Sequence, residues 1–225
     1  RSAGPATGSG EPALRAGDAA ASADRGCRGR RAGARRLAVP RRALAYKRQL
    51  IRVAQAYWGL DAPVARMAGQ IHLESAWIPT AKNPVASGLG QFTARTAATM
   101  AQLYPELDPP QPFSPVWALR AVVIYDLHLY RGIQAHADTS SLPTCTLWAM
   151  ILSAYNGGPG WLERDRRLAQ QRGASPDRWW GAVSEHSRRS AENRRRNRAY
   201  VDAILCRFEP AYRLAGWPGG DDGCQ

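Results

Sequence analysis

The sequence predicts a mostly α-helical protein with one folded domain. Apolar residues recur at helical spacing in several separate segments, and no stretch strongly alternates apolar and polar residues as a half-buried strand does. At 225 residues the chain is long enough for one domain with a sizeable core. We place this domain at residues 41–214, after an arm at 1–40 and before a flexible tail at 215–225.

The arm is rich in Ala, Gly and Arg and has almost no large apolar side chains, so we expect it to be disordered. The chain has a net charge of +13, and residues 1–42 hold ten Arg against three acidic residues. Six further Arg lie between 188 and 198. Such charge favours polyanions, among them nucleic acids and anionic cell-envelope polymers. No nucleic-acid motif is present, so a stable nucleic-acid complex is not expected, although a basic nucleic-acid-binding protein remains the alternative class.

The sequence of the first half of the domain predicts three helices and a loop. The first runs from about Arg41 to Gly59, where the glycine ends it. The second covers about 62–75, with Asp61 as N-cap and Pro63 in its first turn. A third is expected over 92–104, followed by a five-proline loop at 105–115 that we expect as a flap over a groove.

In the second half, Ser114 and Pro115 begin a long helix with an apolar stripe, expected to be the central buried one. Further helices are predicted at 142–156, 178–184 and 191–214. The run Gly157-Gly158-Pro159-Gly160 ends the first of these.

The spacing of the four cysteines fits neither a zinc site nor a CxxC redox motif, so no metal and no cofactor are expected. Cys145 and Cys206 both fall in predicted core helices, either as buried thiols or as one disulfide. His72 forms an H-x-E pattern without the cysteines of a zinc deaminase, which favours a packed histidine.

Glu74 is the residue that most strongly indicates chemistry. Val64, Met67, Ile71 and Glu74 form one stripe at helical period, so the acid lies where a core residue is expected. Loss of water raises the pKa of such a carboxyl and keeps it protonated near neutral pH, as a general acid requires. The alternative is a carboxylate at the solvent edge or paired with an Arg.

The residues around Glu74 carry a specific pattern. The segments ESAWIPTAKNP and SGLGQFTARTA resemble the catalytic signature of the SLT-type lytic transglycosylases, members of the lysozyme-like superfamily related to goose-type lysozymes. The matching residues are Glu74, Ser75, Trp77, Pro79, Ala81, Gly88, Leu89, Gln91, Phe92 and Thr96. Gly90 replaces the usual Met, and the loop from Asn83 to Gly88 is about one residue short.

Two later segments extend the resemblance. Residues 154–160, AYNGGPG, are similar to the family motif A-Y-N-x-G. The family's E-T-R-x-Y-V is matched at Arg196-Asn197-Arg198-Ala199-Tyr200-Val201 in its Arg, Tyr and Val but not in its Glu.

The resemblance implies a lysozyme-like helical domain that binds peptidoglycan glycan strands. Glu74 would protonate the oxygen between N-acetylmuramic acid and N-acetylglucosamine and then deprotonate the muramic 6-hydroxyl, giving 1,6-anhydro ends. The implied substrate-binding residues are Ser75, Gln91, Tyr155, Asn156, Tyr200 and, more weakly because of the shortened loop, Ser87. Among the tryptophans, only Trp77 is expected near the site.

A single-acid site agrees with the absence of Asp and Glu between Ser75 and Pro105, although Asp126, Glu163, Glu185 and Glu192 could fold back. The alternatives are a lysozyme-like muramidase that uses water, and a glycan-binding module without activity.

We expect a monomer in the periplasm or another cell-envelope or extracellular setting, including that of a phage lysis protein, with the arm on anionic envelope polymers. The chain begins at Arg1, so an export signal is neither visible nor excluded.

Overall fold

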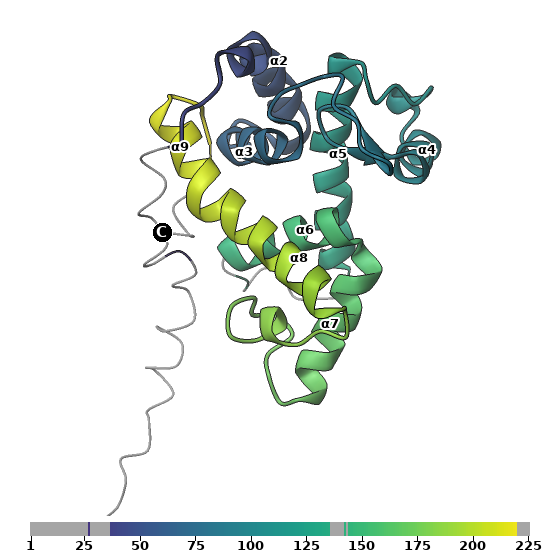
Figure 1. The fold of residues 1–225 in the computed structure, drawn as a ribbon, viewed down its shortest axis with the longest axis vertical. Coiled ribbons are helices and arrows are strands. Elements are labelled where there is room, and N and C mark those ends of the chain that lie inside the picture. Colours follow the sequence, from purple (N-terminus) through teal and green to yellow (C-terminus); the bar gives the residue numbers. More distant parts are fainter. Residues whose placement is uncertain (1–26, 28–36, 136–141, 143, 220–225) are drawn as a thin grey trace, which may run out of the picture.

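The computed structural model describes residue 27, residues 37–135, residue 142 and residues 144–219. The described part is mostly helical, as the sequence predicts (Figure 1). Most of the predicted arm and the end of the predicted tail lie outside the described residues. Within the described ranges, no helix is both long and apolar enough to span a membrane.

The first two helices form one corner of the molecule. Helix α2 (Arg41–Trp58) ends at Gly59, as predicted, and α3 (Val64–Ser75) follows after a turn. The prediction of Asp61 as N-cap is wrong, because the helix begins after Pro63, whose side chain offers no hydrogen-bond acceptor. The apolar stripe of α3 is buried as expected, with Val64, Met67 and Ile71 at 0% exposure.

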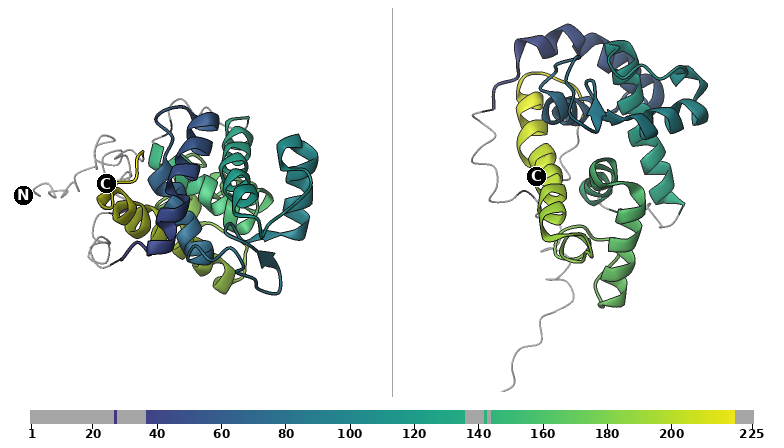
Figure 2. Two further views of the ribbon diagram at one scale, coloured as in Figure 1. Left: turned by 90° about the horizontal axis from the view of Figure 1, so that it is seen from above. Right: turned by 45° about the vertical axis from the view of Figure 1, so that its right-hand side comes forward.

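A short hairpin lies where the sequence predicts the start of the third helix. Strands β1 (Ala86–Ser87) and β2 (Phe92–Thr93) pair antiparallel, with Ala86 opposite Thr93. Helix α4 (Ala94–Leu103) therefore starts two residues later than expected, where the Thr93 hydroxyl accepts from the Thr96 amide. Figure 2 shows α4 standing to one side of the other helices.

The proline-rich loop contains the short 3-10 helix η2 (Pro105–Leu107) and leads into α5 (Pro115–Gln134), which Ser114 caps as predicted. Helix α6 (Thr144–Gly157) is more deeply buried than α5, since all ten residues from 145 to 154 are buried. It packs between α5, α7 and α8. The central helix is therefore α6.

Helix α7 (Pro159–Gln171) is absent from the prediction, whereas the helix predicted at 178–184 is wrong. Its region holds turns and one 3-10 turn, η4 (Val183–Glu185). The sequence hides α7 because its buried side includes the charged residues Asp165 and Arg166.

The last predicted helix is present but contains a wider turn. Helix α8 (Ala191–Ala203), the π-helical segment η5 (Ile204–Phe208) and α9 (Glu209–Leu214) run on as one diagonal rod in Figure 1. The rod packs against α6 at one end and against α3 at the other. It thereby joins the two ends of the molecule.

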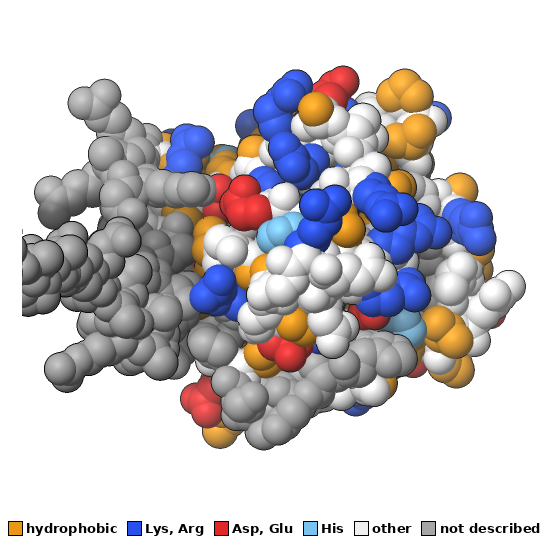
Figure 3. Space-filling view, turned by 90° about the horizontal axis from the view of Figure 1, so that it is seen from below, with side chains coloured by type: hydrophobic (Ala, Val, Ile, Leu, Met, Phe, Trp, Pro, Cys, Tyr) orange, Lys and Arg blue, Asp and Glu red, His pale blue; other side chains and the backbone are white. Residues whose placement is uncertain are grey.

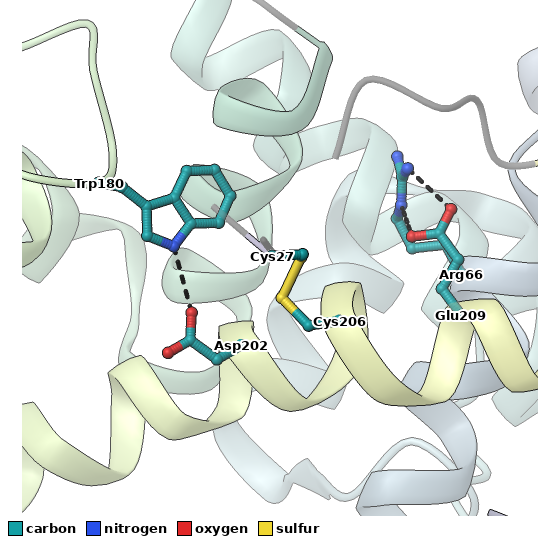
Figure 4. The surroundings of a disulfide bond; sticks show 6 residues. All are labelled: Cys27, Arg66, Trp180, Asp202, Cys206 and Glu209. Atoms are coloured by element: carbon teal, nitrogen blue, oxygen red, sulfur yellow. Dashed lines mark hydrogen bonds and ion pairs between the residues drawn. A yellow bond between two sulfur atoms is a disulfide. The ribbon is translucent and has the colours of Figure 1, made fainter. Parts of the chain in front are cut away.

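Covalent and ionic links fasten this rod. Cys206 of η5 forms a disulfide with Cys27 (Figure 4), so a bond between Cys206 and Cys145 is excluded. Cys145 is disulfide-bonded as well. Beside the first bridge, Arg66 of α3 and Glu209 of α9 form a buried ion pair with two contacts of 2.8 Å.

The first residues of the predicted tail are ordered rather than loose. Trp217 is 3% exposed and packs on Trp77 and Tyr212. The Pro218 carbonyl accepts from the Ala65 amide near the start of α3. Residues 215–219 therefore belong to the domain.

Candidate active site

Glu74 lies in the last turn of α3 and is half-buried. The helix ends in left-handed residues, with φ of 49° at Ala76 and 62° at Trp77. The Ala76 amide donates to the His72 carbonyl and closes the last turn. This sharp exit turns the chain away and leaves the Glu74 carboxyl at the wall of a pocket.

The pocket has a volume of about 290 Å³. Glu74, Gln91, Tyr155 and Asn156 of the predicted site line it together with eight further residues: Asn83, Val85, Ala86, Phe92, Thr93, Thr96, Tyr125 and Arg196. The structure thus brings together side chains from α3, the hairpin, α4, α5, α6 and α8.

Hydrogen bonds to Gln91 fix the hairpin loop. Its Nε2 donates to the carbonyls of Gly88 and Ala81, at 2.9 and 3.2 Å, and its Oε1 accepts from Asn83 Nδ2 at 2.8 Å. Asn83 Oδ1 in turn accepts from the amides of Val85 and Ala86. The Gln91 carboxamide is therefore used within the loop, although the residue faces the pocket.

The Gly90 departure has a packing reason. The Gly90 carbonyl accepts a 2.7 Å hydrogen bond from the Tyr155 hydroxyl. A Cβ at Gly90 would lie 2.6 Å from the Phe92 ring, 2.6 Å from Val122 and 2.9 Å from that hydroxyl. The backbone is thus packed too closely for a side chain at this position.

Tyr200 contacts the acid directly. Its hydroxyl donates to Glu74 Oε1 at 2.5 Å, and the residue is 8% exposed. Because Tyr200 comes from α8, this bond joins two helices that are distant in sequence. It reaches Glu74 from beside the pocket rather than from among the lining residues.

Burial raises the pKa of Glu74 to about 7, and the hydrogen bond from Tyr200 lowers it in part. Burial also raises the pKa of Tyr155 and Tyr200 well above the ordinary value, with Glu74 adding to both. The two hydroxyls therefore stay protonated donors. Near neutral pH, Glu74 can exist in either protonation state.

Among the described carboxylates, Glu74 is the one that lines this pocket. Of the distant acids, Asp126 comes close enough to interact electrostatically with Glu74, but it is fully buried behind the pocket wall. Glu163 lines a different, smaller pocket. Glu185 and Glu192 are exposed elsewhere.

Other predicted site residues lie apart from the lining. The Ser75 hydroxyl donates to the Ile71 carbonyl of its own helix and is buried. Ser87 is half-buried in β1 and pairs with Phe92 in the hairpin. Trp77, expected near the site, is fully buried and does not line the pocket; it donates to the Tyr212 hydroxyl and stacks on Tyr46.

The five-proline loop is not a flap over this pocket, since none of its residues lines it. Instead, a Cβ at Gly88 would lie only 1.7 Å from the carbonyl oxygen of Pro112 in this loop. Gly88 also has a φ of 78°. A glycine is therefore required there for two reasons, positive φ and close approach. The loop therefore packs against the hairpin at Gly88.

A second pocket of about 340 Å³ continues the first, because Asn156 and Arg196 line both. Trp161, Arg189 and Asn193 add to its lining. Figure 3 shows Lys and Arg side chains gathered on the face seen from below. Independently of that view, Arg189 and Arg196 bring positive charge to the lining of the second pocket.

Sequence reasoning missed several lining residues, notably Asn83, Tyr125 and Arg196. Thr93 and Tyr125 carry no sequence signal, because they reach the pocket only through the hairpin and the packing of α5 against α6. Arg196 stands where the third family motif has its Glu, so the motif pointed to this position although the residue type differs.

Comparison with known proteins shows the family of the chain. The sequence profile of the Transglycosylase SLT domain matches residues 50–177, more than half of the chain. The chain therefore belongs to the SLT transglycosylase domain family, and its fold is lysozyme-like. No curated protein sequence matches.

Among solved structures, the chain is similar to the 70 kDa soluble lytic transglycosylase Slt70 of Escherichia coli, with a TM-score of 0.53 and 21% sequence identity. The similarity covers 77% of this chain and 25% of Slt70. The chain thus matches about a quarter of the length of that enzyme, and the likeness shows a common fold.

Proposed function

We propose that this protein is a peptidoglycan lytic transglycosylase that cleaves the β-1,4 bond between N-acetylmuramic acid and N-acetylglucosamine. The observation that carries the proposal is that Glu74 is the one carboxyl, among the described residues, that lines the pocket. Its pKa of about 7 suits both a general acid and a general base. Membership of the SLT family supports the same reaction.

In the proposed reaction, protonated Glu74 gives its proton to the glycosidic oxygen as the bond to the anomeric carbon breaks. The Glu74 carboxylate then takes the proton of the muramic 6-hydroxyl, whose oxygen bonds to that carbon. Glu74 ends protonated, and no water is consumed. Because the nucleophile is part of the substrate, its proximity lowers the barrier and no second carboxylate is needed.

The other site residues receive distinct roles in this proposal. Tyr200 orients Glu74 and stabilises its carboxylate form through the 2.5 Å hydrogen bond. Asn156 and Tyr155 face the glycan strand, Tyr155 also fixing Gly90. Gln91 acts mainly by holding the loop that carries Asn83, while Ser75 and Ser87 support the backbone next to the site.

The disulfide supports a proposal about where the protein works. Cys27–Cys206 is consistent with an oxidising compartment, so we place the protein in the periplasm or another cell-envelope or extracellular location. The basic surface and the Arg-rich arm would hold it on anionic envelope polymers. We propose a monomer.

The test is digestion of purified peptidoglycan followed by mass spectrometry of the released muropeptides. We expect 1,6-anhydro ends, one water lighter than hydrolysed ends. Reducing ends would instead identify a muramidase that uses water. Release of no fragments would contradict cleavage altogether.

Substitution of the acid tests its role. Glu74→Gln should lower turnover by about 10²- to 10⁴-fold, because the amide can neither give nor take the proton. Glu106→Gln is the matched control, since it makes the same change at a carboxyl that contacts Tyr57 outside the pocket. A Glu74→Gln enzyme with full activity would exclude the mechanism.

A further inference from the structure

A second carboxyl lies buried behind Glu74, where the proposed mechanism does not use it. Asp126 of α5 is 0% exposed, and its Oδ1 accepts a 3.3 Å hydrogen bond from Nε2 of Gln70, which is also 0% exposed. Gln70 precedes Glu74 by four residues, so both lie on the same face of α3. Neither Asp126 nor Gln70 lines the pocket.

This pair leaves two polar atoms without a partner. Gln70 Oε1 and Asp126 Oδ2 are both buried, and neither has a hydrogen-bond partner among the described residues. Both are acceptors if Asp126 is ionised, so they cannot satisfy each other. An ionised carboxylate in this position would have one hydrogen bond and no direct counter-ion, which is costly.

The basic side chain that interacts electrostatically with Asp126 is already engaged. Arg66, one turn before Gln70 on α3, makes two 2.8 Å contacts with Glu209. Its guanidinium also lies over the Trp148 ring, at 4.9 Å. Arg66 therefore acts on Asp126 only from a distance.

One proton on Asp126 would satisfy both unpartnered atoms. We propose that Asp126 is protonated at Oδ2 and donates to Gln70 Oε1, so that a closed carboxylic acid–carboxamide pair forms an uncharged floor behind Glu74. Two side chains would then exchange two hydrogen bonds, and neither would leave a buried polar atom unmatched. Asp126 contacts no substrate in this arrangement and is a positioning residue.

The surrounding groups favour the neutral form. Burial raises the pKa of Asp126 to about 8, against the lowering effect of the Gln70 bond, and Glu74 raises it further while Arg66 lowers it. The titratable groups that interact with this site come from four helices: Arg66 and Glu74 on α3, Tyr125 on α5, Tyr155 on α6 and Tyr200 on α8.

The consequence for Glu74 rests on the proposed function. In the second half of the reaction, Glu74 must exist as a carboxylate before it takes the proton of the 6-hydroxyl. A neighbouring anion would oppose that ionisation, because like charges raise each other's pKa. A neutral Asp126 removes this opposition, and its pair with Gln70 fixes the helical turn that carries Glu74.

Infrared difference spectroscopy tests the protonation directly. At neutral pH, the spectrum of the wild type minus that of Asp126→Asn should contain the C=O band of a protonated carboxylic acid. Asp61→Asn is the matched control, because Asp61 is exposed and its loss should remove carboxylate bands instead. Loss of carboxylate bands in Asp126→Asn would overturn the proposal.

Kinetics test the positioning role. Asp126→Asn replaces one uncharged group by another and can still exchange two hydrogen bonds with Gln70. In the range below pH 8, the alkaline limb of its kcat/KM profile should therefore lie within about 0.3 pH units of the wild-type limb. If Asp126 were ionised in the wild type, the Asn variant would lack a negative charge beside Glu74, and the pKa of Glu74 would fall. The limb would then move to lower pH by about a unit or more, which would overturn the proposal.

Asp126→Leu fills the site with an apolar side chain that cannot form a hydrogen bond with Gln70. We expect it to lose about tenfold in kcat/KM, while Asp126→Asn stays within about threefold. Equal loss in the two variants would contradict the pairing. The infrared band requires no activity, so it separates failure of this inference from failure of the proposed transglycosylase reaction.

Discussion

At the scale of single residues, Glu74 is governed by two opposed effects on one carboxyl. Burial favours the protonated form, and the Tyr200 hydroxyl favours the ionised form. The result, a pKa of about 7, lies between a solvent-exposed glutamate and an isolated buried one. The two effects can be tested separately, by removing the Tyr200 hydroxyl and by removing the charge of Glu74.

Tyr200→Phe should raise the pKa of Glu74, because the carboxylate loses the hydrogen bond that stabilises its charged form. The alkaline limb of the pH profile of kcat/KM, measured by muropeptide release, should therefore move to higher pH. Tyr130→Phe removes a hydroxyl of α5 that binds Gln134 outside the pocket, and it should leave the limb in place. An unmoved limb in Tyr200→Phe would argue against this coupling.

Glu74 also predicts a pH-dependent stability difference. Its pKa rises from 4.5 to about 7 in the folded protein, so the folded state binds the proton more tightly. The stability this contributes is fully present below pH 4.5 and is lost as pH rises through 7. Relative to the wild type, Glu74→Gln should thus be more stable at pH 8 by up to about 3 kcal/mol.

Urea unfolding at pH 4 and pH 8 measures this difference. Near pH 4 the two proteins should differ little, since a protonated Glu and a Gln are both neutral. A stabilisation of the same size at both pH values would show that ionisation of Glu74 is not its cause.

Much of the site is readable at the residue scale. Four residues that the motifs predict for the site line the pocket: Glu74, Gln91, Tyr155 and Asn156. Phe92 and Thr96, which also match the signature, line it as well. Ser75 and Trp77 belong to the same signature yet point into the structure. A motif shows that a residue type is required, and only the fold shows whether substrate or packing requires it.

At the scale of elements, α3 is held in place by the helices behind it. The Arg66–Glu209 pair joins α3 to α9, and Gly69 allows a close approach, since a Cβ there would lie 2.9 Å from Phe208 Cβ. These contacts set the position of the turn that carries Glu74.

Glu209→Gln should lower the free energy of unfolding by about 3–5 kcal/mol, because Arg66 would remain buried without its counter-ion. Urea denaturation with a circular-dichroism signal measures the loss. The double variant Arg66→Met/Glu209→Leu removes both charges and should be clearly more stable than Glu209→Gln. If the single variant were as stable as the wild type, the ion pair would not be a structural tie.

Element prediction succeeded where the buried residues of a helix are apolar and failed where they are charged. Helices α2, α5 and α6 follow their apolar patterns closely. Helix α7 buries Asp165 and Arg166, and Asp165 is matched by Arg189 and Arg198 at 3.1 and 3.2 Å. Such charge pairing between distant segments gives no periodic signal.

At the scale of the whole molecule, the Cys27–Cys206 disulfide ties a residue of the arm to the terminal helical rod across 179 positions. Closing so long a loop reduces the entropy of the unfolded chain. The bridge therefore bears on global stability rather than on the pocket.

The variant Cys27→Ala/Cys206→Ala should lose about 2–4 kcal/mol in free energy of unfolding, with the order of the site retained. Chemical denaturation gives the stability, and muropeptide release at a temperature well below the midpoint gives the activity. At that temperature the variant is still folded, so a clear loss of activity would show that the bridge also orders the pocket.

The sequence by itself determined the helical class, the family motifs and the acid at position 74, because apolar periodicity and local motifs are written in consecutive residues. The tertiary structure alone decided which cysteine pairs with Cys206 and which carboxyl lies behind Glu74. It also decided that Tyr200 donates to the acid. These contacts join residues far apart in the chain, and their partners are selected by the packing of whole helices rather than by any local pattern.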